Sequence, residues 1–228
     1  MSPLPSPAAF APGRFRLLLL SLLLFFGGTA AATGTRLERF IDFILLAVMI
    51  VTAVLDLRVP GQHRLVSTAL AVGAILLSMA DLNVRIRHLP MIAGTVVGLF
   101  AGLVVWLAYA AVMRPQRSVG DRIVGAICVY LLIGLAWAKV YETLDGVAPG
   151  SFRFPSDTGW ATPSPLRYSY FSFVTLATLG YGDVAPVTVL AGTLAWLEAI
   201  TGQLYLAITV ARLVALSLGE SSGSDTVQ

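Results

Sequence analysis

The sequence predicts an all-α membrane protein with six transmembrane helices and a short re-entrant helix between the fifth and the sixth. Of its 228 residues, 57% are hydrophobic and only 12% are charged. Six apolar runs approach or exceed the roughly 20 residues that a helix needs to cross a bilayer. Each run should be helical, because backbone inside lipid has to satisfy its own hydrogen bonds.

The six predicted transmembrane segments divide the chain into a four-helix part and a two-helix part. They are Leu17–Thr33, Phe40–Leu57, Leu65–Ala80, Leu89–Met113, Ile123–Leu144 and Val187–Leu218. We therefore expect four regions: an N-terminal tail over residues 1–16, a four-helix bundle over 17–114, a two-helix module over 115–218 and a disordered polar tail over 219–228.

The first apolar segment has two interpretations. Arg14 and Arg16 precede it, and the small residues Thr29–Ala32 end it, which is also the design of a cleaved secretory signal peptide. The alternative is a transmembrane helix that stays in the mature chain. The remaining segments have the same topology in both cases.

The fourth segment, Leu89–Met113, contains no charged residue. The arginines near it lie in the flanking loops, at Arg85, Arg87, Arg114 and Arg117. A helix responds to the membrane potential through its charges, at about 2.3 kcal/mol per charge per 100 mV. We therefore expect the four-helix bundle to be insensitive to voltage.

A short helix and a glycine-rich loop separate the fifth and sixth segments. Ser164 is a good N-cap and Pro165 a good first helical residue. As a helix, Leu166–Ala177 would span only ~18 Å, which is too short to cross a bilayer. The following loop, Thr178–Asp183, reads Thr-Leu-Gly-Tyr-Gly-Asp. Its alternate glycines allow successive carbonyls to point the same way.

The hexapeptide and its surroundings resemble the potassium-channel superfamily, in its prokaryotic form with six transmembrane helices and one pore loop. The resemblance covers about Ile123–Leu218 and implies a re-entrant pore helix followed by a selectivity filter of stacked carbonyl oxygens. The residues implied to form the K⁺-binding filter are Thr178, Leu179, Gly180, Tyr181 and Gly182. An outer-surface turn is the alternative for the hexapeptide taken alone.

The acidic residue after the filter, Asp183, is expected to support it. In the superfamily the corresponding acid accepts a hydrogen bond from the pore helix. Val174 has no polar group to offer here, but Tyr170 or Tyr168 could donate, as could Trp160 of the preceding loop.

Gly202 and Glu198 of the sixth segment each have more than one possible role. Gly202 lies where many potassium channels carry a gating hinge, but glycine also allows close helix packing. Glu198 lies mid-span, where a carboxylate is costly unless it is paired or hydrated. It could brace the filter, accept a hydrogen bond from a neighbouring subunit, stay protonated or reach water in a cavity. The candidate pore-lining residues, which recur at helical spacing, are Gln203, Leu206 and Val210.

The resemblance implies a potassium-selective channel subunit that conducts passively as a homotetramer, because one loop cannot surround an ion. It also implies a multi-pass protein of the cell membrane with both termini in the cytoplasm, because the pore loop enters from outside. The alternatives are a non-selective cation channel and a non-conducting sensor or assembly subunit with a pore-like fold.

No other chemistry is indicated. The sequence shows no metal cluster and no nucleophile–base pair, so we expect neither an enzyme nor a cofactor, with K⁺ as the permeant ion only. The lone Cys128 is interpreted as a packing residue. Without a polybasic stretch we expect no nucleic-acid partner. Membrane lipids and an unidentified gating partner remain as expected partners.

Overall fold

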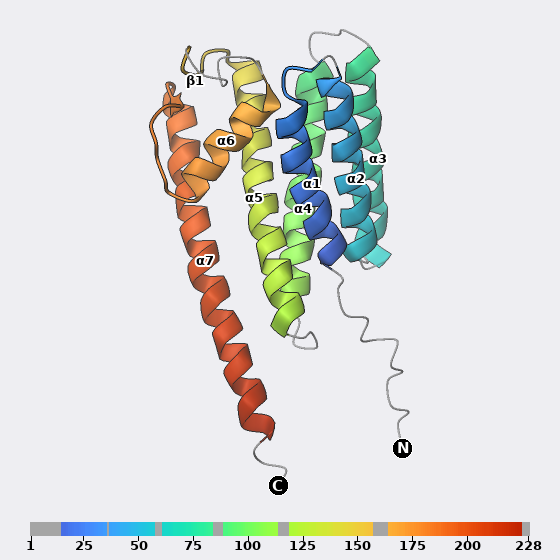
Figure 1. Cartoon of the computed structure of the whole chain (residues 1–228), viewed down its shortest axis with the longest axis vertical. Helices are drawn as coiled ribbons and strands as arrows, with labels where there is room; N and C mark the ends of the chain where they lie inside the picture. The colour runs from blue at the N-terminus through green and yellow to red at the C-terminus, as the bar shows by residue number, and fades with distance from the viewer. Residues whose placement is uncertain are drawn as a thin grey trace.

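The computed structural model describes residues 15–35, 37–57, 61–83, 89–113, 119–156 and 164–224. Within these ranges the chain is almost entirely helical, and its helices lie side by side along one direction, except for a short oblique one (Figure 1). The long helices are α1 (Arg16–Ala32), α2 (Glu38–Leu57), α3 (Gly61–Asn83), α4 (Leu89–Val112), α5 (Val119–Val147) and α7 (Val189–Ser224). The short helix α6 (Pro165–Leu176) crosses obliquely between α5 and α7.

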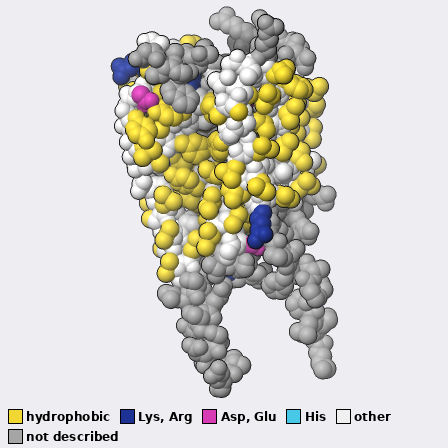
Figure 2. Space-filling model, viewed as in Figure 1, with side chains coloured by type: hydrophobic (Ala, Val, Ile, Leu, Met, Phe, Trp, Pro, Cys, Tyr) yellow, Lys and Arg dark blue, Asp and Glu magenta, His cyan; other side chains and the backbone are white. Residues whose placement is uncertain are grey.

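Among the described residues, three helices are long and apolar enough to cross a membrane: Ile92–Val112, Gly120–Val147 and Val189–Ala215. The apolar parts of α1, α2 and α3 are shorter, and their crossing of a bilayer stays a prediction. In the described part of the face that Figure 2 shows, hydrophobic side chains are spread widely and charged ones are few. A surface of this kind belongs in lipid or against other apolar surfaces, so the chain is a multi-pass membrane protein.

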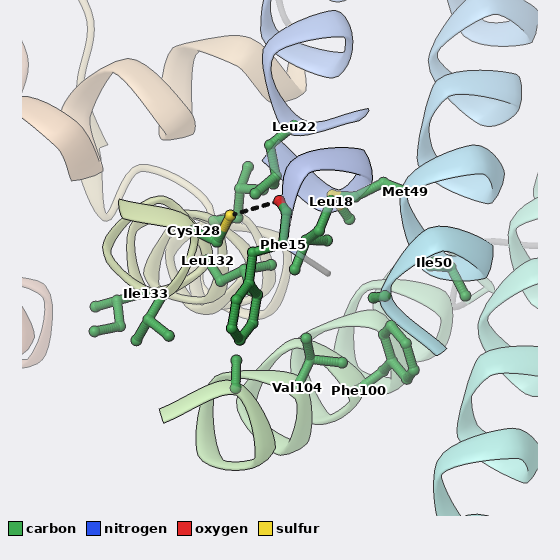
Figure 3. Packing of buried hydrophobic residues seen from close by; sticks show 14 of the residues in the cluster. Phe15, Leu18, Leu22, Met49, Ile50, Phe100, Val104, Cys128, Leu132 and Ile133 are labelled. Atoms are coloured by element: carbon green, nitrogen blue, oxygen red, sulfur yellow. Dashed lines mark hydrogen bonds between the residues drawn. The ribbon is translucent and has the colours of Figure 1, made fainter. Parts of the chain in front are cut away.

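The core of the helical bundle lies where α1, α2, α4 and α5 meet (Figure 3). Phe15, expected in the N-terminal tail, is instead 1% exposed in this core, which corrects the predicted boundary at residue 16. The reason is Gly125 of α5, where a Cβ atom would lie 2.7 Å from the Phe15 ring. Cys128 is fully buried in the same core, and its Sγ lies 3.6 Å from the carbonyl oxygen of Phe15.

A small antiparallel ribbon fixes the chain where it leaves the glycine-rich loop. Strand β1 (Phe152–Arg153) pairs with β2 (Ala185–Pro186), with Phe152 opposite Pro186. The Val187 amide continues the pairing by donating to the Ser151 carbonyl at 2.8 Å. The segment that returns from the loop is therefore attached to the end of the α5 region before α7 begins.

Helix α7 is longer than expected. It continues to Ser224, whereas the sequence predicted a disordered tail from residue 219. Extending an existing helix adds one hydrogen bond per residue fixed, so polar residues can prolong it without a new nucleation step. Residues 225–228 lie outside the described residues.

Candidate ion-conduction site

The short helix α6 begins at the predicted cap. The Ser164 side chain accepts a hydrogen bond from the Leu166 amide at 3.3 Å, and Pro165 is the first helical residue. Proline suits this position because its missing N–H would have no partner there. The helix then runs for 12 residues and ends against α7.

The C-terminal end of α6 leads directly into the loop through a Schellman motif. The Leu179 amide donates to the Val174 carbonyl, and the Thr178 amide donates to the Thr175 carbonyl, both at 2.9 Å. These two bonds are the 6→1 and 5→2 bonds of that motif. Thr178 occupies its left-handed position, with φ +56°, where glycine is usual.

Positive φ angles then recur at alternate residues. Thr178, Gly180 and Gly182 have φ of +56°, +57° and +78°. In an extended strand successive carbonyls point to opposite sides. A reversed sign of φ at every second residue turns alternate peptide planes and lets neighbouring carbonyls share one side. This is the backbone geometry that a row of ion ligands requires.

The loop Thr178–Gly182 is exposed on the chain. Leu179 and Tyr181 are 56% and 66% exposed, and they are the large side chains of this loop. Among the described residues, no cluster of three or more His, Cys, Asp or Glu could hold a metal ion. The groups that Thr178–Gly182 offers to an ion are its backbone carbonyls and the hydroxyls of Thr178 and Tyr181.

Asp183 is held at both carboxylate oxygens. The Tyr170 hydroxyl donates to Oδ2 at 2.6 Å, and the Val184 amide donates to Oδ1 at 2.9 Å. The hydrogen bond from Tyr170 holds the pKa of Asp183 below its ordinary value of 3.8. Burial and this same bond raise the pKa of Tyr170 to about 12. Of the other proposed donors, Tyr168 bonds to a different carboxylate and Trp160 lies outside the described residues.

A second carboxylate, Asp145, anchors the outer end of α5 to α6. Its Oδ1 accepts hydrogen bonds from the Gly150 and Ser151 amides at 3.1 and 3.0 Å. Its Oδ2 accepts from the Tyr168 hydroxyl at 2.6 Å, and Arg167 lies 3.6 Å away. The role of Asp145 could not be predicted, because its only signal in the sequence is an acid before a glycine-containing loop.

Two neighbouring residues of α7, Gly202 and Gln203, contact the end of α6 and the start of the loop. Gln203 Nε2 donates a long hydrogen bond of 3.4 Å to the Thr178 hydroxyl oxygen. Gly202 is buried, and a Cβ atom there would collide with the carbonyl oxygen of Leu176. The other two candidate pore-lining residues, Leu206 and Val210, are 42% and 57% exposed on the chain. The position of Gly202 thus shows close packing, and its hinge role stays a prediction.

Glu198 is fully buried behind α6. Its carboxyl oxygens lie 2.5 Å from the hydroxyls of Tyr141 on α5 and Ser172 on α6. Both contacts of Glu198 are within the same chain, and one of them is to α6, the helix that precedes the loop. Its other expected roles stay predictions.

Comparison with known proteins gives two matches. Residues 126–217 match the model of a protein family described as ion channel. A segment of 84 residues is 34% identical to the Inward rectifier potassium channel Kirbac3.1 of Paramagnetospirillum magnetotacticum. Part of the chain is thus similar to ion channels, among them a potassium channel. The second match covers 37% of this chain and only 24% of the relative's length. No solved structure matches the chain.

Both matches are to channels, so they indicate a channel rather than an enzyme. The family match includes most of α5, all of α6, the Thr178–Asp183 loop and most of α7. It leaves out α1 to α4, so the layout with six transmembrane helices stays a prediction.

Proposed function

We propose that the chain is one subunit of a potassium-selective channel, in which Thr178–Gly182 is the filter and α6 the re-entrant pore helix. The observation that carries this proposal is the alternation of positive φ at Thr178, Gly180 and Gly182 directly after the end of α6. A row of carbonyls on one side of the backbone can replace the water around a K⁺ ion.

A homotetramer in the cell membrane supplies the rest of the ion's coordination. One loop offers carbonyls from one direction only, and its exposed Leu179 and Tyr181 leave surface for contact with other copies. In this arrangement the Tyr181 rings pack outward and hold the filter open. The exposed Leu206 and Val210 of α7 line the pore below it. Both termini face the cytoplasm, and conduction follows the electrochemical gradient.

Selective flux through liposomes tests this proposal. Reconstituted protein should pass K⁺ and give a reversal potential close to that of K⁺ when K⁺ and Na⁺ gradients oppose each other. Gly180→Ala puts a side chain at φ +57° and should abolish the K⁺ flux.

Equal permeability for K⁺ and Na⁺ would instead make the chain a non-selective cation channel. The absence of flux in every lipid and at every pH tested would indicate a non-conducting subunit. Gly102→Ala is the matched control, because this helical glycine of α4 has no atom within 4 Å of an added Cβ.

A further inference from the structure

Glu198 lies at the junction of the three helices that form the pore module. It is 0% exposed, its Oε2 lies 2.5 Å from the Tyr141 hydroxyl, and its Oε1 lies 2.5 Å from the Ser172 hydroxyl. Within the described ranges no cation forms an ion pair with it. Burying an unpaired carboxylate costs several kcal/mol or more. The protonation state of Glu198 therefore determines how strongly these helices are joined.

The number of hydrogens available at this junction shows whether Glu198 is ionised or neutral. The Ser172 hydroxyl lies not only beside Glu198 but also 2.7 Å from the carbonyl oxygen of Gly134 on α5. A serine hydroxyl has one hydrogen and can donate to only one acceptor, and a carbonyl oxygen has none. Three oxygen–oxygen contacts thus need three hydrogens, while Ser172 and Tyr141 together supply two.

We propose that Glu198 is a neutral carboxylic acid that positions the filter helix. Its Oε1–H donates to Ser172, the Ser172 hydroxyl donates to Gly134, and the Tyr141 hydroxyl donates to Oε2. This assignment gives every contact one hydrogen. With Glu198 ionised, one of the two oxygen contacts of Ser172 would have no hydrogen between the two oxygens. The negative charge of the carboxylate would also be buried.

The junction lies one helical turn from the end of α6. Leu176 follows Ser172 by four residues, and Gly202 follows Glu198 by four, so both pairs lie on the same two facing helix surfaces. At the second pair the Leu176 carbonyl packs directly on Gly202. Loss of the first contact would therefore loosen the second, next to Thr178.

The groups around Glu198 offer no compensating charge. From α5, the titratable groups that face it are Tyr141 and Tyr130, and α6 contributes Ser172, which does not titrate. Lys139 and Glu142, also on α5, pair with each other at 2.6 Å. A further consequence rests on the proposed channel function: K⁺ flux falls when a raised pH removes the Glu198 proton.

Glu198→Gln separates the neutral acid from the ionised one. A glutamine amide can donate to Ser172 through its NH₂ and accept from Tyr141 through its oxygen, so it preserves the pattern of the neutral acid. We expect this variant of the full chain to unfold within about 2 °C of wild type and Glu198→Ala to unfold about 5–10 °C lower. Glu142→Gln is the matched control, because it removes a carboxylate from a partly exposed site.

Infrared difference spectra of wild type minus Glu198→Gln report the protonation state directly. At pH 7 we expect the C=O stretch of a carboxylic acid, absent when Glu142→Gln is used instead. A carboxylate band in its place, or a Glu198→Gln variant as unstable as Glu198→Ala, would overturn the proposal. In liposomes the K⁺ flux of Glu198→Gln should stay constant where that of wild type falls with rising pH. Protein without any K⁺ flux but with the acid band would refute the channel function and leave the neutral Glu198 in place.

Discussion

The backbone conformation of Thr178 is unfavourable for its residue type. Thr178 is a β-branched residue at φ +56°, and it is the one described non-glycine residue with positive φ. This conformation costs a non-glycine residue roughly 1–2 kcal/mol. Glycine would satisfy the Schellman motif without that cost. The hydroxyl, which accepts from Gln203, is the feature that glycine would lack. Strain kept at one residue of a candidate site points to a role for its side chain.

Replacing Thr178 should therefore separate stability from conduction. We expect Thr178→Gly to raise the stability of the fold by about 1 kcal/mol, because it relieves the left-handed strain. The same variant should lose K⁺ flux, because it lacks the hydroxyl ligand. Thr178→Ser keeps the hydroxyl and should conduct. Thermal unfolding in K⁺-free buffer and liposome flux measure the two effects. A lower unfolding temperature for Thr178→Gly would show that the threonine side chain contributes more than its strain costs.

The Tyr170–Asp183 hydrogen bond should make the loop resistant to acid. Because the pKa of Asp183 is lowered on folding, its stabilising effect is present above the ordinary value of 3.8 and is lost as pH falls through the lower folded value. Tyr170→Phe removes the main cause of that shift and should move the acid-induced loss of K⁺ flux to higher pH. Flux measured between pH 3 and pH 5 tests this. Identical acid midpoints for the two proteins would contradict it.

At the scale of elements, apolar runs predicted the helices well because a membrane demands them. The observed α1, α2, α4 and α5 begin and end within a few residues of the predicted segments. The capped start of α6 could also be predicted from the sequence, since Ser164 and Pro165 are adjacent. Contacts between residues far apart in the sequence could not be predicted. Asp145 bonds to Tyr168, 23 positions later, and nothing in the spacing indicates that pair.

The contact between α6 and α7 gives the clearest prediction at this scale. Gly202→Ala places a Cβ against the backbone oxygen of Leu176, which cannot move without disturbing the end of α6. We expect a loss of about 1–3 kcal/mol in stability, as in other overpacked sites, despite the higher helix propensity of alanine. Thermal unfolding measures this loss.

The exposed helical glycine Gly102 provides the control for this variant. An added Cβ there meets nothing within 4 Å, so Gly102→Ala should be neutral or slightly stabilising. A stable Gly202→Ala that conducts less would support the hinge interpretation over the packing one.

At the scale of the whole molecule, the four helices α1 to α4 are joined to α6 by specific contacts. The ring of Phe26 on α1 meets that of Phe173 on α6 edge to face, with centroids 5.2 Å apart. At the other end of α6, the Ser164 hydroxyl lies 3.4 Å from a Glu38 carboxylate oxygen on α2. Movement of α1 or α2 would therefore reach α6 directly, although the family match does not include α1 or α2.

We expect that the membrane potential does not move the four-helix bundle. Helix α4 has no charged residue from Leu89 to Val112. A single charge crossing the full field would contribute about 4.6 kcal/mol over 200 mV, or more than a thousandfold in an equilibrium constant. Without such a charge we expect the open probability in planar bilayers to change less than about twofold between −100 and +100 mV. Gly180→Ala controls for leak, since it should carry no current. A steep voltage dependence would require gating charges elsewhere and would refute the assignment of α1 to α4 as a voltage-insensitive bundle.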